Sequence, residues 1–266
     1  MNNKLKVSII IVGLSFSIPS FSQIINIDKS DTEAYVKKQV WNGNISLGLE
    51  IDKQKTTLID ASNFFDGSLQ SFHELFVLSA SSRFTYNGPN DFLNAGYIHL
   101  RWRHSYKDKW HPETFIQYQW DNARGLKSRY LAGENIRYNL FRSNTWEMTF
   151  ATGLMYEDET WTYKAVDSSK IPINHPDVHR SHFKSNSYIK WDGKLSATST
   201  FSFIVFYQAL FDNFLKPRIA TSVNYNVDIS KKFSLNVKLS SLYDAAPIVP
   251  IVDFYYNFSY GLMYKF

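Results

Sequence analysis

The chain has 266 residues, with 29 Lys and Arg against 24 Asp and Glu, which gives a formal net charge of +5 at pH 7. This small and scattered excess is not the concentrated basic patch of a nucleic-acid-binding protein, so no nucleic-acid partner is expected. The sequence contains no cysteine, which excludes disulfides, thiolate metal sites and cysteine nucleophiles.

The amino terminus has the layout of a secretory signal peptide. Lys4 and Lys6 form a short basic start, residues 7–18 are largely apolar, and Pro19 ends this apolar run. Ser20 and Ser22 then supply the small residues of a cleavage site. The apolar run is too short for a spanning helix. We therefore expect a signal peptide at residues 1–22, followed by a polar periplasmic lead-in at residues 23–39.

From residue 40 to the end, apolar and polar residues alternate in short segments, as in β-strands with one apolar face. The pattern predicts an all-β fold: a transmembrane antiparallel up-and-down β-barrel of about 12 strands over residues 40–266. Its strands are expected near 40–52, 54–65, 73–87, 92–106, 112–122, 127–141, 145–157, 183–193, 198–210, 217–229, 233–244 and 251–266.

The spacing of these segments predicts which connections lie on which side. With both termini periplasmic, the longest connection, at residues 158–182, is extracellular, and the turns at 142–144 and 230–232 are short and periplasmic. The segment 66–72 is long for a periplasmic turn, so the strand boundaries before residue 73 fit this register least.

Within each strand, charged residues are concentrated on one parity, which predicts a polar lumen and an apolar outer surface. The predicted lumen-lining side chains are Arg83, His99, Arg101, Arg103, Arg129, Arg137, Glu147 and Glu157. Glu134 breaks the rule, because it shares the outward parity of Tyr130 and Ile136. A β-bulge near residues 131–133 would turn it inward, and Gly133 would permit such a bulge. A position near the membrane interface is the alternative explanation.

The final strand indicates the cellular location of the protein. Every second residue from Phe258 to the end is large and apolar, and the chain ends on Phe266. The residues Tyr260, Leu262, Tyr264 and Phe266 match the carboxy-terminal assembly signal of outer-membrane barrels. We therefore expect a cell outer-membrane protein. Its expected partners are outer-membrane lipid, lipopolysaccharide and the barrel-assembly machinery, and an envelope protein partner remains open.

Residues 113–157 carry a spaced pattern of aromatic, glycine and charged residues. It consists of Phe115, Gln117, Leu126, Arg129, Leu131, Gly133, Arg137, Gly153, Tyr156 and Glu157. This pattern resembles a domain-of-unknown-function family of salt-induced outer-membrane proteins. The resemblance implies an outer-membrane barrel and brings no catalytic residues. The chain departs from the pattern at Glu134 and Asn135, where small or apolar residues are expected.

Three groups of residues are candidates for a functional site. His175, Asp177, His179 and His182 could bind Zn²⁺ or Cu²⁺, although their spacing is not a standard metal motif and an ordinary polar loop explains them as well. His179 and Ser181 share a strand face, as a base and its serine nucleophile would. The basic stripe on the lumen face could select anions in a pore, or it could fill the interior with salt bridges.

Taken together, these patterns predict a non-enzymatic outer-membrane barrel with no cofactor, acting as a narrow pore or as a structural or accessory envelope protein. The sequence identifies no solute. The alternatives are a barrel enzyme of the lipase or protease class and a subunit of a larger outer-membrane complex.

Overall fold

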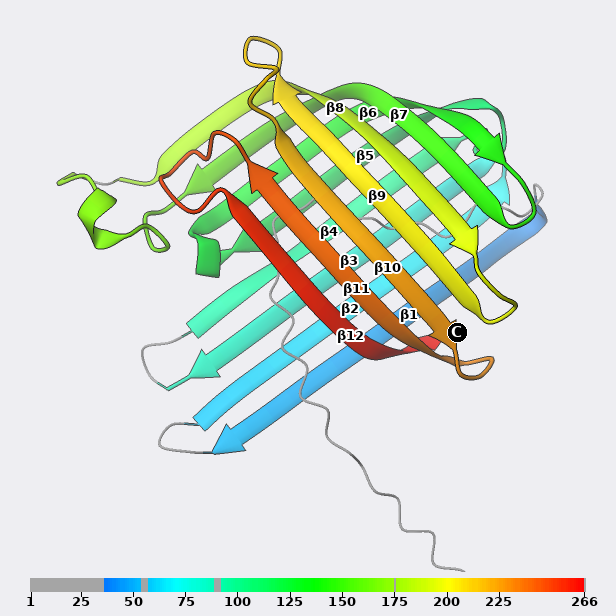
Figure 1. The fold of residues 1–266 in the computed structure, drawn as a ribbon, viewed down its shortest axis with the longest axis horizontal. Coiled ribbons are helices and arrows are strands. Elements are labelled where there is room, and N and C mark those ends of the chain that lie inside the picture. The colour runs from blue at the N-terminus through cyan, green and yellow to red at the C-terminus, as the bar shows by residue number, and fades with distance from the viewer. Residues whose placement is uncertain (1–35, 54–56, 89–91, 175, 266) are drawn as a thin grey trace, which may run out of the picture.

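The computed structural model describes residues 36–53, 57–88, 92–174 and 176–265, and shows a closed antiparallel barrel (Figure 1). Each strand pairs with its neighbours in the sequence, and β1 pairs with β12. The predicted fold class and the count of twelve strands are confirmed. No helix in the described part of the chain is long and apolar enough to cross a membrane.

The strands are long, which suits a barrel wall that crosses a bilayer at a tilt. Their bounds are β1 Val36–Lys53, β2 Thr57–Phe72, β3 Glu74–Asn87, β4 Phe92–His104, β5 Trp110–Asp121, β6 Leu126–Arg142, β7 Trp146–Trp161, β8 Val178–Lys194, β9 Ser199–Leu210, β10 Arg218–Asp228, β11 Phe233–Asp244 and β12 Phe254–Lys265, with 3₁₀ turns η1 at Asn122–Arg124 and η2 at Ser168–Lys170.

The strand boundaries differ most from the predicted ones in three regions. Strand β2 continues through residues 66–72, and β3 begins directly after His73, so the expected long turn there does not exist. Phe72 takes a positive φ of 47° at this tight turn, which the sequence did not signal. Strand β1 begins inside the segment 23–39, and β7 and β8 extend into the long loop, which is reduced to residues 162–177. The expected signal peptide lies outside the described residues.

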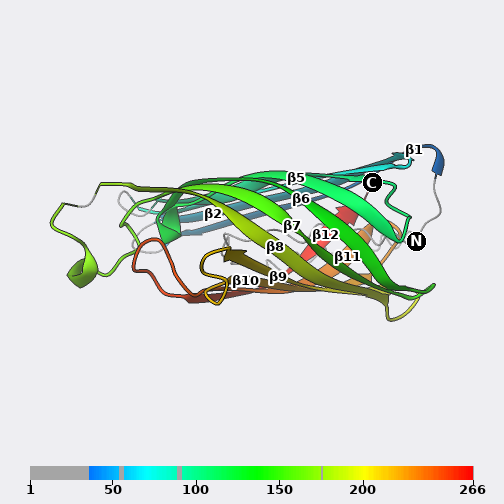
Figure 2. The same cartoon turned by 90° about the horizontal axis from the view of Figure 1, so that it is seen from above.

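The two ends of the barrel differ in their connections (Figures 1 and 2). One end, the short-turn end, carries the tight connections at 73, 105–109, 143–145, 195–198 and 229–232. The other end, the long-loop end, carries the larger ones, including 162–177 and 245–253. This is the asymmetry expected of outer-membrane barrels, in which short turns face the periplasm.

The strand register separates two chemically different faces. On β7 and β8, for example, Phe150 pairs with Ile189 and Met148 with Trp191 on the outside, while Ala151 pairs with Tyr188 inside. The outward side chains are large, apolar and exposed, among them Leu47, Leu49, Ile98, Ile116, Leu154, Phe183, Leu239 and Phe258. The predicted parity of the faces is thus seen in the structure, because side chains two apart in a strand share a face.

Glu134 remains on the outer face, so the predicted bulge near residues 131–133 is wrong. The pairing of β5 with β6 runs without a shift from Leu131 to Arg137, and Glu134 is exposed opposite Thr114. The register shifts of β6 fall instead near its two ends. Gly133 has a different cause: a Cβ there would lie 2.5 Å from the ring of Phe115, so glycine makes room for that ring.

The closure between β1 and β12 is the weakest pairing of the barrel. The described register joins these strands only at Asn44–Lys265 and Ile45–Tyr264, whereas β1 and β2 pair over nearly their whole length. Figures 1 and 2 show the two strands diverging from this point toward the long-loop end. Continuing the same register would place Leu47 opposite Leu262, which joins two outward apolar side chains.

This register predicts that β1 and β12 can pair further along their length. In the double variant Leu47→Cys/Leu262→Cys, we expect a disulfide under mild oxidation, because directly opposed antiparallel residues lie within the Cα separation that a disulfide spans. The chain has no native cysteine to compete. Electrophoretic mobility with and without reductant measures the cross-link. The pair Leu47→Cys/Tyr260→Cys is displaced by two positions and should stay reduced; equal cross-linking of both pairs would contradict this register.

Candidate functional site: the barrel interior

The interior is filled unequally around the barrel. The middle parts of β4 to β9 turn side chains inward that are almost completely buried; we call this the packed wall. The inward residues of β1, β2 and β10 to β12 are mostly smaller and polar; we call this the polar wall. Some of them are half-exposed, and others, such as Ser222, Ser240 and Ser259, are buried.

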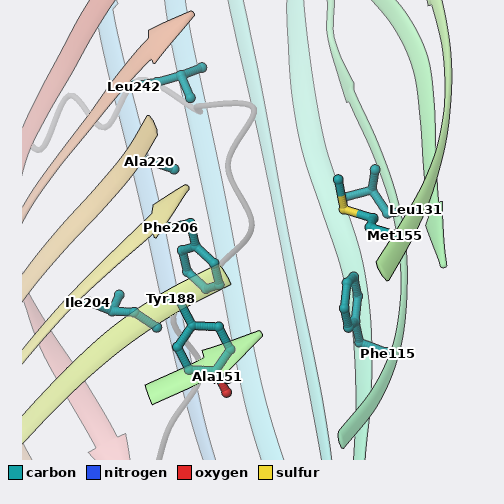
Figure 3. Packing of buried hydrophobic residues seen from close by; sticks show 9 residues of the cluster. All are labelled: Phe115, Leu131, Ala151, Met155, Tyr188, Ile204, Phe206, Ala220 and Leu242. Atoms are coloured by element: carbon teal, nitrogen blue, oxygen red, sulfur yellow. The ribbon is translucent and has the colours of Figure 1, made fainter. Parts of the chain in front are cut away.

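An apolar cluster occupies the centre of the packed wall (Figure 3). The rings of Tyr188 of β8 and Phe206 of β9 pack in a tilted arrangement, with their centroids 5.0 Å apart. Phe115, Leu131 and Met155 approach from β5, β6 and β7, and none of them is more than 3% exposed. Side chains packed to this density exclude water, so this part of the barrel behaves as a protein core rather than as a channel.

A single carboxylate organises the charges beside this core. Glu113 of β5 receives Arg103 Nε at 2.8 Å, Arg137 Nη1 at 3.1 Å and the hydroxyl of Tyr188 at 2.9 Å. Arg101 Nη1 lies 3.6 Å from the same carboxylate. All four charged side chains are at most 1% exposed. This Glu113 cluster therefore holds three guanidinium groups around one acid.

A second network lies toward the long-loop end. Glu157 and Glu159 of β7 bind Arg218 Nη1 at 2.7 and 2.8 Å, and both pair with Arg129. Asp244 accepts from Arg218 Nε at 2.8 Å, and Lys184 pairs with Glu157. In this Glu157 network, three cations balance three anions. Buried guanidinium groups are tolerated when carboxylates satisfy them from several sides.

The remaining inward ion pairs are also balanced. Arg83 pairs with Asp60, Arg142 Nη2 with Glu147 Oε1 at 2.8 Å, and Lys190 with Asp192. Lys238 on the polar wall differs, because no ion-pair partner for it is found among the residues that the structure describes. It is half-buried and lies between Asn224 of β10 and Ser259 of β12.

Loops close part of the long-loop end. Val166 of the connection 162–177 and Val249 of the connection 245–253 pack with Leu126 and Trp161, all at most 7% exposed. Arg124 of η1 stacks on Tyr255, with its guanidinium 4.0 Å from the ring centroid. Burial lowers the pKa of Arg124, an effect that Asp121 and Tyr255 oppose. This cap covers the packed wall, so that this wall is filled from its centre to the rim.

The structure places all eight predicted lumen residues inside the barrel. Only Arg83 keeps appreciable exposure, at 17% of its side chain; the others are buried, and His99, Arg101, Arg103, Arg129 and Arg137 are at most 1% exposed. His99 interacts through Nδ1 with Gln117 Oε1 at 2.9 Å. Apart from Arg83, the basic stripe is therefore buried in the packed wall.

The described residues of the predicted metal site do not converge. His179 faces outward and His182 inward on β8, and Asp177 accepts from Lys127 at 2.8 Å. His175 lies outside the described residues. Within the described ranges, no group of three or more His, Asp or Glu side chains is placed to hold a metal ion. Of the predicted assembly signal, Tyr260 and Leu262 lie exposed on the outer face, while Phe266 is not described.

His179 and Ser181 do come together, on the outer face near the long-loop end. Ser181 Oγ lies 3.3 Å from His179 Nε2 and donates to Asp158 Oδ2 at 2.6 Å. His179 Nδ1 is 3.2 Å from Thr160 Oγ1. Asp158 is the acidic neighbour that sequence reasoning did not identify, because the pairing of β7 with β8 was needed to place it opposite Ser181.

Sequence reasoning also missed Glu113, Glu159, Arg218 and Asp244. Their parity alone would have placed them inside, since Glu113 shares a face with Phe115 and Gln117. The register sets Glu113 opposite Arg103 and Glu159 opposite Arg129 on adjacent strands. The contact of Arg218 with Glu157, in contrast, spans 61 positions.

Comparison with known proteins identifies the family. A family profile described as "Protein of unknown function, DUF481" matches residues 66–266. The chain belongs to this family. The salt-induced character that the sequence resemblance suggested remains a prediction. No curated protein sequence matches the chain.

Solved structures with a similar fold are barrels of low identity. A KdgM porin in complex with disordered oligogalacturonate is 10% identical, covers 86% of this chain and 99% of its own, and gives a TM-score of 0.41. The NanC porin is 10% identical with coverages of 86% and 98%, and the β domain of the Bordetella autotransporter BrkA is 9% identical with the same coverages; both have TM-scores of 0.43. Likenesses this low say nothing about what this chain does.

The Glu113 cluster predicts a large effect of one mutation. Glu113→Gln should destabilise the barrel by about 3–5 kcal/mol, because it leaves buried guanidinium groups without their carboxylate. Urea unfolding of the protein in lipid vesicles measures the change. Glu134→Gln is the matched control: its carboxylate is exposed on the outer face, and a change within about 0.5 kcal/mol is expected. Equal losses in both variants would refute the organising role of Glu113.

Proposed function

We propose that this protein is a non-enzymatic outer-membrane barrel that forms a narrow, anion-preferring channel along its polar wall. The observation that carries the proposal is the asymmetry of the interior. The packed wall is sealed by buried side chains, whereas the polar wall keeps half-exposed polar groups, such as Asn44, Asn224 and Lys238, between buried serines.

The outer surface supports the membrane location. Exposed apolar and aromatic side chains cover it, and Trp and Tyr residues such as Trp41, Trp102, Trp110 and Tyr256 are among them. A water-soluble protein rarely exposes so large an apolar surface. In a bilayer, the same surface faces hydrocarbon, and the closed strand pairing satisfies the backbone. The alternation at the carboxyl terminus supports the outer membrane in particular.

The polar wall provides the side chains that line the proposed passage. Its half-exposed inward residues are Asn44, Ser46, Gly48, Ser62, Asn224, Asn226, Asn236, Lys238, Gly261 and Met263. A Cβ added at Gly261 would meet no atom within 4 Å, so there is open space beside it. Hydroxyl and amide groups can replace part of the water around a solute, and a passage of this kind remains narrow because the packed wall fills the rest of the barrel.

Lys238 gives the passage a fixed positive charge. In a confined, low-dielectric space, one charge without a nearby counter-charge raises the local concentration of the opposite ion. The arginines of the packed wall do not contribute in this way, because they are buried and bound to carboxylates. The selectivity is thus assigned to Lys238 rather than to the basic stripe.

Single-channel recording tests this proposal. The refolded protein in a planar bilayer should show small current steps, with a reversal potential in a salt gradient that indicates anion preference. Lys238→Glu should reverse that preference, because the fixed charge on the passage changes sign. Arg101→Gln alters the packed wall and should keep the parental reversal potential. No current from a folded barrel would reject the channel.

A second candidate function, ester hydrolysis at the outer rim, is favoured by one observation: the contact of Ser181 with His179 and Asp158. In that reaction Ser181 Oγ attacks the ester carbonyl and its proton passes to His179 Nε2. The leaving alcohol takes this proton, and water then cleaves the acyl-serine. The carboxylate here contacts Nε2, at 3.3 Å, whereas a triad carboxylate holds the opposite ring nitrogen. This candidate therefore ranks behind the channel.

Hydrolysis of a short-chain phospholipid in mixed micelles tests the second candidate. If it is correct, Ser181→Ala abolishes fatty-acid release, since no other group at that position can form the acyl intermediate. Ser185→Ala is the control, because Ser185 lies on the same face of β8 and donates to the carbonyl of Ala209. Absence of release by the parent protein excludes the activity.

A further inference from the structure

The seam between β1 and β12 is open over most of its length (Figure 1). Among the described residues, the two strands pair only at Asn44–Lys265 and Ile45–Tyr264. On their other sides, β1 pairs with β2 as far as Lys53, and β12 pairs with β11 as far back as Phe254. At about 3.3 Å per residue, each strand therefore continues for at least about 25 Å beyond the recorded pairs, toward the long-loop end.

The outward side chains of β1 along this seam are more exposed than those of the paired wall. Leu47, Leu49 and Ile51 are 72%, 70% and 65% exposed. Leu100 and Leu154, which lie between two paired strands, are 39% and 58% exposed. The difference is surface that a neighbouring strand covers elsewhere. A stripe of apolar surface along the seam therefore faces the bilayer.

Open strand edges cannot face hydrocarbon. The backbone N–H and C=O groups of an edge need hydrogen-bonding partners, and lipid chains offer none. Either the two strands pair directly, or polar atoms of another molecule enter between them. The seam therefore requires an occupant with polar groups whenever it is open.

There is space for such an occupant on the inner side of the seam. A Cβ built on Gly261 of β12 would meet no atom within 4 Å. Continuing the recorded register places Gly48 of β1 directly opposite Gly261. Two opposed glycines make no side-chain contact across the strands, so this row adds little to direct pairing.

The side chains beside this space are polar and include one cation. On β11, Asn236 pairs with Gly261 and Lys238 with Ser259, and both β11 side chains are half-exposed on the polar wall. In the part of the chain that the structure describes, no acid pairs with Lys238. A lysine side chain can reach across one strand spacing of about 4.8 Å. A phosphate group in the seam would accept a charge-assisted hydrogen bond from it.

We propose that the open seam binds a membrane lipid with a phosphate headgroup. The headgroup enters between β1 and β12, where its oxygens accept hydrogen bonds from the backbone N–H groups of the two edges and from Lys238. The acyl chain stays outside, on Leu47, Leu49 and Ile51. A strand of a partner chain would also satisfy the edges, but the glycines would give its side chains little contact, whereas the lysine favours a phosphate. The site needs no ion flow along the polar wall.

Photolabelling with two probes tests the headgroup. In dodecyl maltoside micelles, phosphatidic acid with a diazirine on its acyl chain should form adducts concentrated on residues 46–51 and 256–262, mapped by peptide mass spectrometry. It should label these residues about tenfold more than diacylglycerol with the same chain, because one hydrogen bond to a charged group supplies about this ratio. Even labelling of the whole outer surface would overturn the proposal and would leave direct pairing or a partner strand in the seam.

Two lysine variants test the cation. Lys238→Gln should remove most of the preference for phosphatidic acid. Lys232→Gln changes an exposed lysine at the short-turn end and should keep the preference. A preference of unchanged size in Lys238→Gln would overturn the proposal.

A reversible cross-link tests the place of the site. Ile51 and Phe258 are opposed in the continued register, so Ile51→Cys/Phe258→Cys should form a disulfide that closes the seam across the glycine row. Oxidation should abolish labelling of the seam, and reduction of the same sample should restore it, which also shows that the variant is folded. The control Phe150→Cys/Ile189→Cys links paired residues of β7 and β8 and should leave labelling unchanged. Seam labelling that persists in the oxidised Ile51→Cys/Phe258→Cys variant would overturn the proposal.

Discussion

The packed wall depends on the burial of Glu113 among arginines. One carboxylate on β5 collects groups from β4, β6 and β8, and so ties together four strands whose side chains would otherwise repel one another. Ion pairs in a dry interior are specific rather than strongly stabilising, because desolvation offsets much of their attraction. The network thus fixes which side chains meet across the lumen, while the strand ladder and the apolar packing supply most of the cohesion.

The polar wall follows from what the packed wall leaves unfilled. Arginine, tyrosine and phenylalanine side chains from β4 to β9 reach across the interior, and small residues such as Ser46, Gly48 and Gly261 face them from the other side. A barrel of twelve strands is too wide for small side chains alone to fill and too narrow for a wide aqueous pore once one wall is occupied. Its interior is therefore divided between a core and a polar margin.

The sequence predicted the architecture well, because strand alternation is a local property. It placed the strand faces, the twelve strands and the inward orientation of residues such as Arg129 and Glu157. It failed where the answer depended on register. Gly133 was interpreted as a bulge, although it accommodates Phe115, and the segment 66–72 was interpreted as a turn, although it continues β2. Two of the acids that pair with the basic stripe, Glu113 and Glu159, were missed, because only the strand register places them opposite Arg103 and Arg129.

The connectivity of the packed wall bears on how the chain folds. Strands β4 to β9 are consecutive and form an unbroken series of hairpins, so this half can assemble as an open sheet with modest loop-closure cost. In such a sheet the arginines and glutamates can form their ion pairs while they are still hydrated. The first and last strands meet afterwards, over a short register. Closure is then the step at which the interior loses its water and the ion pairs become permanently enclosed.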